Sequence, residues 1–89
     1  MIEHSITIIN KLGLHARAAA KLVSTASAYS SKIKVAYDGK EVDGKSIMSV
    51  MMLAVSKGCE LSLKVEGDDE SAALQAIIEL INNRFDEEE

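Results

Sequence analysis

A histidine and an arginine stand two residues apart where a loop is expected to become a helix. The segment Gly13-Leu14-His15-Ala16-Arg17 follows a turn-like stretch at residues 10–13, and the sequence from Ala16 onward is rich in helix formers. His15 is therefore predicted to lie at or near a helix N-terminus. The first backbone N–H groups there have no intrahelical partner and the helix dipole is positive, so an anion is favoured.

The two side chains suit phosphoryl chemistry at such a position. An imidazole nitrogen is nucleophilic at neutral pH and can form a covalent intermediate. The guanidinium of Arg17 carries a permanent charge, and its forked donors match phosphate oxygens. The alternative is that His15 is only a capping or surface residue, and these few residues alone leave both interpretations open.

Two longer motifs occur in order along the chain. Residues 11–20 read KLGLHARAAA, and residues 45–54 read KSIMSVMMLA after Gly39-Lys40. The first motif resembles the active-site segment of the histidine-containing phosphocarrier proteins of the bacterial phosphotransferase system. The second resembles the regulatory-serine region of the same family, and the resemblance covers essentially the whole chain.

The resemblance implies a protein that carries a phosphoryl group and is not itself an enzyme. His15 would accept the group from the phosphoenolpyruvate-dependent first enzyme and pass it to a downstream acceptor protein. Arg17 and the backbone of Ala16 and Ala18 would hold the phosphoryl group, with no cofactor. We expect the protein to be a cytoplasmic monomer. The family usually has proline where Ala18 stands, and Ala18 leaves one more N–H donor and a looser first turn.

Composition limits the other functions. The chain has 89 residues, which we interpret as one domain over residues 1–89, and its formal charge of −4 and three aromatic residues argue against a nucleic-acid binder. The single Cys59 fits a reducing cytoplasm, and its simplest role is that of a small apolar residue beside a strand. No stretch approaches membrane-spanning length, so no membrane insertion is expected. Two histidines and one distant cysteine predict no metal site.

Hydrophobic patterning predicts the order βαββαβα. Ile2, His4, Ile6 and Ile8 alternate with polar residues, which predicts a strand with one buried face and a half-buried His4. Further strands are expected over residues 32–37, 40–43 and 61–65, with a hairpin turn at Asp38-Gly39. Helices are expected over residues 16–28, in the middle segment, and after a cap at Asp68 or Asp69, with Leu74, Ile77, Ile78, Ile81 and Phe85 at helical spacing. This order and the short loops favour an α+β fold, a four-stranded antiparallel sheet with three helices on one face. The resemblance implies the same arrangement, since the resembled family has an open-faced β-sandwich.

The middle helix is apolar nearly all round, although a short helix over a sheet can bury only one side. We assign Val50, Leu53 and Ala54 to the core. The remaining apolar residues of this helix are expected to form an exposed patch that docks donor and acceptor proteins: Ile47, Met48, Met51 and Met52. Ala20 of the first helix is expected to belong to the same docking surface. The alternative is that these side chains complete a core poor in aromatic residues.

Ser46 precedes the middle helix, and an N-cap role alone explains a serine there. The resemblance adds regulatory phosphorylation of Ser46 by a serine kinase, reversed by a phosphorylase. Phosphate at a helix N-terminus is compatible with the fold and would repel an acidic partner. The second hypothesis for function is therefore a regulatory interaction protein that acts through Ser46 and the apolar patch.

The C-terminal residues give two expectations. Residues 10–13 and the ending Arg84-Phe85-Asp86-Glu87 are similar to the nitrogen-related branch of the resembled family. The acidic residues 86–89 are expected to form a solvated, frayed tail.

Overall fold

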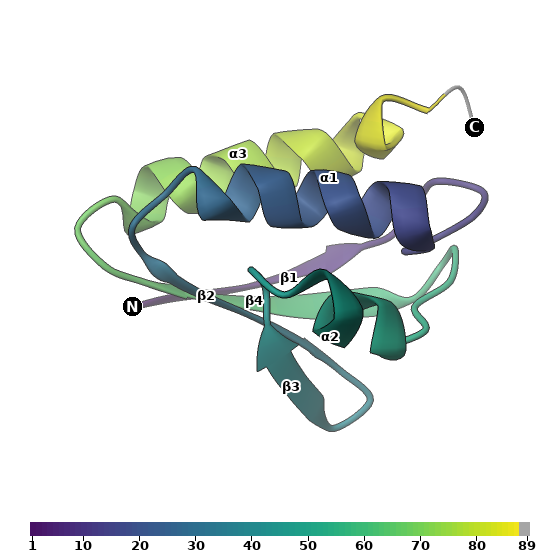
Figure 1. The fold of residues 1–89 in the computed structure, drawn as a ribbon, viewed down its shortest axis with the longest axis horizontal. Coiled ribbons are helices and arrows are strands. Elements are labelled where there is room, and N and C mark those ends of the chain that lie inside the picture. Colours follow the sequence, from purple (N-terminus) through teal and green to yellow (C-terminus); the bar gives the residue numbers. More distant parts are fainter. Residues whose placement is uncertain (88–89) are drawn as a thin grey trace.

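The structure, a computed structural model, describes residues 1–87. Within them the chain forms β1 (Ile2–Thr7), α1 (Ala16–Ser27), β2 (Lys32–Tyr37), β3 (Lys40–Asp43), α2 (Ile47–Met52), β4 (Glu60–Glu66) and α3 (Glu70–Asn82), followed by a 3₁₀ turn, η1 (Arg84–Asp86). The predicted order βαββαβα and the α+β open-faced sandwich are confirmed. In Figure 1, α1 and α3 run alongside each other on one side of the sheet, and α2 lies near β3.

The sheet is antiparallel, with the strand order β1-β4-β2-β3. Strand β4 pairs with both β1 and β2, so two connections cross over a neighbouring strand. The connection from β1 to β2 contains α1, and the connection from β3 to β4 contains α2. The β2–β3 hairpin turns at Asp38 and Gly39, whose φ angles are 52° and 80°. Positive φ at both positions is what a two-residue hairpin turn requires, and the predicted turn is confirmed.

The core lies between the sheet and the helices. Its side chains come from alternate strand positions and from one face of each long helix, as the two periodicities predict. The fully or almost fully buried members include Ala18, Ala19, Leu22, Ala26, Ile33, Val35, Leu61, Leu63, Val65, Ala73, Ile77 and Ile81.

The C-terminal end departs from the expected helix. Helix α3 ends at Asn82, and Arg84, Phe85 and Asp86 all have φ between 54° and 62°. This left-handed turn directs the Phe85 side chain into the core, where it is fully buried. Lys21 of α1 donates a hydrogen bond to the Phe85 carbonyl at 2.6 Å, which fixes the turn against the first helix. Phe85 is therefore a core residue, but it lies outside the helix.

Two burial predictions are wrong. His4 is exposed because β1 is an edge strand and the helical layer does not cover His4 there. Ala54 is exposed as well. It follows Leu53, the C-cap residue of α2, and its own φ angle is 53°. The left-handed conformation ends the helix and turns Ala54 away from the core that Val50 and Leu53 join.

Asp69 is the N-cap residue of α3, but its side chain makes no cap hydrogen bond. Its carboxylate instead accepts from the backbone N–H groups of Ser30 and Ser31, at 2.9 and 3.0 Å, and from both serine hydroxyls. These donors, led by the Ser31 hydroxyl, lower the pKa of Asp69 from 3.8 to about 2. The residue joins the start of α3 to the loop that follows α1.

Candidate functional site

His15 is the N-cap residue of α1, as its position in the sequence predicts. Its backbone is extended, with φ of −77° and ψ of −176°, and its Nδ1 accepts a hydrogen bond from the Arg17 N–H at 3.4 Å. The first bond of the helix runs from the Ala19 N–H to the His15 carbonyl at 2.9 Å. The N–H groups of Ala16, Arg17 and Ala18 thus precede the regular helical bonds, and that of Arg17 donates to Nδ1 of the imidazole.

The loop before His15 is fixed by close backbone packing. Leu14 donates its N–H to the Val55 carbonyl at 2.9 Å, and Gly13 has φ of 65°. A Cβ at position 13 would collide with the Val55 carbonyl oxygen and lie 2.8 Å from Cα of Ser56. Only glycine allows both this conformation and this approach, so residues after α2 help to position His15.

Arg17 lies in the first turn of α1 with an exposed side chain. Ala16 is also exposed, whereas Ala18 is fully buried. The structure therefore brings together the four residues that were predicted to hold a phosphoryl group, although Ala18 can contribute only its backbone.

Glu87 reaches this site from the other end of the chain. Its Oε2 lies 3.4 Å from Nε2 of His15, and its Oε1 accepts a hydrogen bond from Nδ2 of Asn10 at 3.0 Å. The Glu87 side chain is only 12% exposed, and Asn10 is fully buried. The expectation of a solvated acidic tail is therefore wrong at Glu87, because Asn10 and His15 offer it polar partners; residues 88–89 lie outside the described residues.

Glu87 is the residue at the candidate site that sequence reasoning missed. Asn10 and Glu87 are separated by 77 positions, and a run of acidic residues at a chain end carries no sign of a specific contact. The one available signal was Phe85, an apolar residue one turn beyond Ile81 in the helical pattern. Its burial in the core would bring the residues after it back toward the fold.

The middle helix carries the exposed apolar patch that its composition predicts. Met48 and Met52 are 66% and 74% exposed, and Ile47 and Met51 are exposed to a lesser degree. Val50 is fully buried on the opposite side of the same helix. Ala20 is also exposed, and so is Leu12 in the loop before His15, which sequence reasoning did not include.

Ser46 is the N-cap residue of α2. Its Oγ accepts from the Ser49 N–H at 3.4 Å and contacts the Ser49 hydroxyl at 3.0 Å. The predicted cap is confirmed, and it sets the hydroxyl at the start of the helix that carries the patch.

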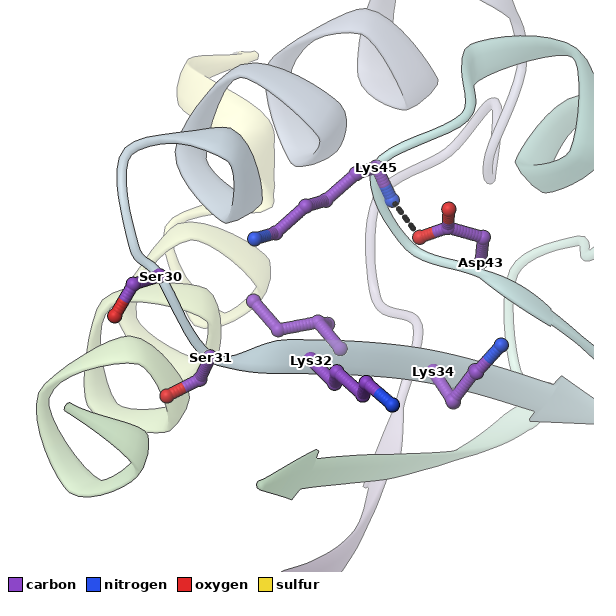
Figure 2. Close-up of a pocket in the computed structure, with 7 residues that line it drawn as sticks. Ser30, Ser31, Lys32, Lys34, Asp43 and Lys45 are labelled. Atoms are coloured by element: carbon purple, nitrogen blue, oxygen red, sulfur yellow. Dashed lines mark hydrogen bonds between the residues drawn. The ribbon is translucent and has the colours of Figure 1, made fainter. Parts of the chain in front are cut away.

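Other parts of the described chain offer less. A hollow of about 260 Å³ lies outside the candidate site, and none of the predicted site residues lines it. Figure 2 shows its lining side chains, among them Ser30, Ser31, Lys32, Lys34, Asp43 and Lys45. No group of three or more His, Cys, Asp or Glu side chains in residues 1–87 could hold a metal ion. No helix in the same range is long and apolar enough to cross a membrane.

Cys59 is half-buried next to β4 and contacts the Ser56 hydroxyl at 3.4 Å and the Tyr37 hydroxyl at 3.2 Å. These hydrogen bonds, that of Ser56 first, lower the pKa of Cys59. The side chain lies beside a strand as expected, although its neighbours are more polar than the sequence predicted.

Comparison with known proteins finds one family. A family model described as "PTS HPr component phosphorylation site" matches residues 2–83. The phosphocarrier protein HPr of Pseudomonas aeruginosa is 61% identical over 85 residues, which cover 94% of each chain. The solved structure of HPr-C-His from Thermoanaerobacter tengcongensis matches with a TM-score of 0.96 and 52% identity, covering 100% of both chains.

A structure described as an HPr dimer from the same organism has a TM-score of 0.79 and 52% identity, and the match covers 98% of this chain and 100% of that one. The matches as a whole favour a phosphocarrier over the alternative of a purely regulatory interaction protein.

Proposed function

Because this chain belongs to the HPr family of phosphocarrier proteins of the phosphotransferase system, we propose that His15 is its phosphoryl acceptor. His15 receives the group from the phosphoenolpyruvate-dependent first enzyme and passes it to a downstream acceptor protein. The observation that carries this proposal is the position of the His15 imidazole at the N-cap of α1, with Nδ1 accepting from the Arg17 N–H in the first turn of the helix.

The nucleophile in this proposal is Nδ1. The other ring nitrogen, Nε2, is buried against Glu87 and is withdrawn from an incoming donor. Nδ1 attacks the phosphorus atom of the phosphorylated donor, an N–P bond forms, and the bond from phosphorus to the donor breaks with its electron pair remaining on the donor. Transfer to the acceptor protein reverses these changes at His15.

The first turn of α1 stabilises the transferred group. Once Nδ1 carries phosphorus, the Arg17 N–H can no longer donate to that nitrogen and turns to a phosphoryl oxygen. The N–H groups of Ala16 and Ala18 and the positive end of the helix dipole add to this attraction. The exposed guanidinium of Arg17 can close over the oxygens as charge moves between the two proteins.

The α2 patch of Ile47, Met48, Met51 and Met52 is the proposed docking surface, together with Ala20 of α1. Flexible methionine side chains can repack against different partners, which suits a carrier that must bind a donor and then an acceptor. Phosphorylation of Ser46 by a serine kinase, with removal by a phosphorylase, would add negative charge beside this patch and weaken docking of an acidic partner.

The proposal also covers the branch of the phosphotransferase system, the cellular location and the oligomeric state of the protein. The similarity of residues 10–13 and 84–87 to the nitrogen-related branch supports an acceptor in that branch, and two of those residues, Asn10 and Glu87, contact each other at the site. The family and the single unpaired cysteine support a cytoplasmic protein. A monomeric carrier is part of this proposal, whereas one related structure is described as an HPr dimer.

Charging the protein with labelled phosphoenolpyruvate and the first enzyme tests the proposal. Label is expected on His15 and should be acid-labile and base-stable, as a phosphoramidate is. His15→Ala should abolish labelling while its thermal melting stays close to that of the unchanged protein, because the His15 side chain caps only one N–H. Label that persists in His15→Ala, or that resides on His4, would contradict the proposal.

A further inference from the structure

We propose that Glu87 is a positioning residue that keeps the proton of His15 on Nε2 and so leaves Nδ1 free as the nucleophile. This inference rests on the proposed function, because it concerns how the same histidine is prepared for transfer. It assigns a chemical role to the C-terminal turn, which returns the end of the chain to the start of α1.

The Glu87 side chain is held in place by several contacts. Its Oε1 accepts from Nδ2 of Asn10 at 3.0 Å, and the same amide donates to the Gly13 carbonyl at 2.9 Å. The turn before it is fixed by the buried Phe85 ring and by Lys21, which donates a hydrogen bond to the Phe85 carbonyl at 2.6 Å. A carboxylate held this firmly at a chain end has lost conformational freedom, which a surface tail would retain.

The contact between Glu87 and His15 is the unexplained part of this arrangement. Nε2 of His15 and Oε2 of Glu87 face each other at 3.4 Å, and both atoms are buried without a hydrogen-bond partner among residues 1–87. Buried polar atoms are costly when unpaired. A proton on Nε2 satisfies both atoms after a small approach, since Nε2–H then donates to Oε2.

The other ring nitrogen requires the same tautomer. Nδ1 accepts from the Arg17 N–H, so it carries a lone pair and no proton. A neutral imidazole has one donor and one acceptor nitrogen, and the bond made by one nitrogen fixes the state of the other. Glu87 and the Arg17 N–H therefore select the same tautomer from opposite sides of the ring.

This tautomer matters during transfer. When Nδ1 attacks phosphorus, the proton stays on Nε2 and the ring gains positive charge. The carboxylate of Glu87 faces that charge on the side away from the incoming group, so it stabilises the ring without repelling the phosphoryl oxygens directly. Buried carboxylates orient histidines in this way in other catalytic sites.

Glu87→Gln is a sharp test because Asn10 can only donate a hydrogen bond to the side chain at position 87. The Asn10 amide must present Nδ2 to the Gly13 carbonyl, so it presents a donor to position 87 as well. A glutamine there has one oxygen for two donors. If that oxygen accepts from Asn10, the glutamine NH₂ faces Nε2 of His15 and favours the tautomer with the proton on Nδ1.

The experiment compares the unchanged protein, Glu87→Gln and the matched control Asp86→Asn. Both variants remove one negative charge, but Asp86 faces Lys21 and Asn83 and makes no contact with His15. The ¹⁵N resonances of the His15 imidazole are recorded at about pH 8.5, where an ordinary imidazole is neutral. The rate of charging by the phosphorylated first enzyme is measured on the same samples.

Glu87→Gln should move the proton population toward Nδ1 and slow charging by at least about tenfold, the effect expected for loss of an orienting partner. Asp86→Asn should keep the imidazole spectrum and the charging rate of the unchanged protein. An unaltered tautomer in Glu87→Gln, or an equal change in Asp86→Asn, would overturn the inference while leaving His15 as the acceptor. Absence of label from His15 in the unchanged protein would instead overturn the proposed function, and the role of Glu87 in transfer with it.

Discussion

At the scale of single residues, His15 has two functions in the resting protein that change when it carries a phosphoryl group. It caps α1 through Nδ1, and the same nitrogen is the proposed nucleophile. The cap is weak, at 3.4 Å, so little is lost when the Arg17 N–H moves to a phosphoryl oxygen. In the proposed transfer, the protein thus exchanges a long hydrogen bond for charge-assisted ones.

Substitutions of Arg17 test whether binding of the phosphoryl oxygens needs the guanidinium side chain as well as the backbone N–H donors. Arg17→Ala should slow charging of His15 by about 10²-fold, the scale of losing one donor to a developing oxyanion. Arg17→Lys should slow it less, because lysine keeps the charge but loses the forked geometry. The measurement is single-turnover charging by the first enzyme.

The matched control for Arg17 is Lys57→Ala, an exposed cation outside the site, whose removal changes the net charge equally. Charging that is as fast in both Arg17 variants as in the unchanged protein would refute the role. If Lys57→Ala slowed charging of His15 as much as Arg17→Ala does, the effect of Arg17 would be explained by net charge alone.

At the scale of elements, α2 divides its apolar residues between the core and the surface. Val50 is fully buried, whereas Met48, two positions earlier, is 66% exposed. A helix of six residues has one side facing the sheet and leaves the other in water, which is why the sequence could predict the exposed patch from composition alone. The sequence could not show that α2 stops at Met52 with a left-handed Ala54, because alanine gives no sign of such a turn.

The pair Met48→Asp and Val50→Asp separates docking from packing. Met48→Asp should weaken binding to the first enzyme by about 1–3 kcal/mol, the scale of losing an interface anchor, with little change in melting temperature. Val50→Asp should destabilise the fold by about 3 kcal/mol or more because it buries an unpaired charge. The measurements are titration calorimetry and thermal melting on both variants.

Two results would contradict the docking assignment. Met48→Asp could lose stability in parallel with binding, which would make Met48 part of the core. Alternatively it could bind the first enzyme as well as the unchanged protein, which would remove the patch from that interface.

At the scale of the whole molecule, segments far apart in the sequence meet at the site. The loop that carries Asn10 and Gly13 packs on Val55 after α2, and Glu87 returns across α1 from the C-terminal turn. The helices, the strands and the position of His15 at a helix start could be predicted from the sequence. Helix periodicity, strand alternation and the N-cap position each depend on residues that are neighbours in the chain. The contact of Glu87 with His15 could not be predicted, since it depends on a left-handed turn that no local pattern marks.

The handover of the phosphoryl group tests the central claim that the whole molecule is a carrier. Protein charged with labelled phosphate is purified away from the first enzyme and mixed with an acceptor protein of the phosphotransferase system, while hydrolysis is followed in parallel without acceptor. The account predicts that label leaves His15 and appears on the acceptor much faster than it is released as inorganic phosphate. Label that leaves His15 only as inorganic phosphate, at the same rate with and without acceptor, would contradict it.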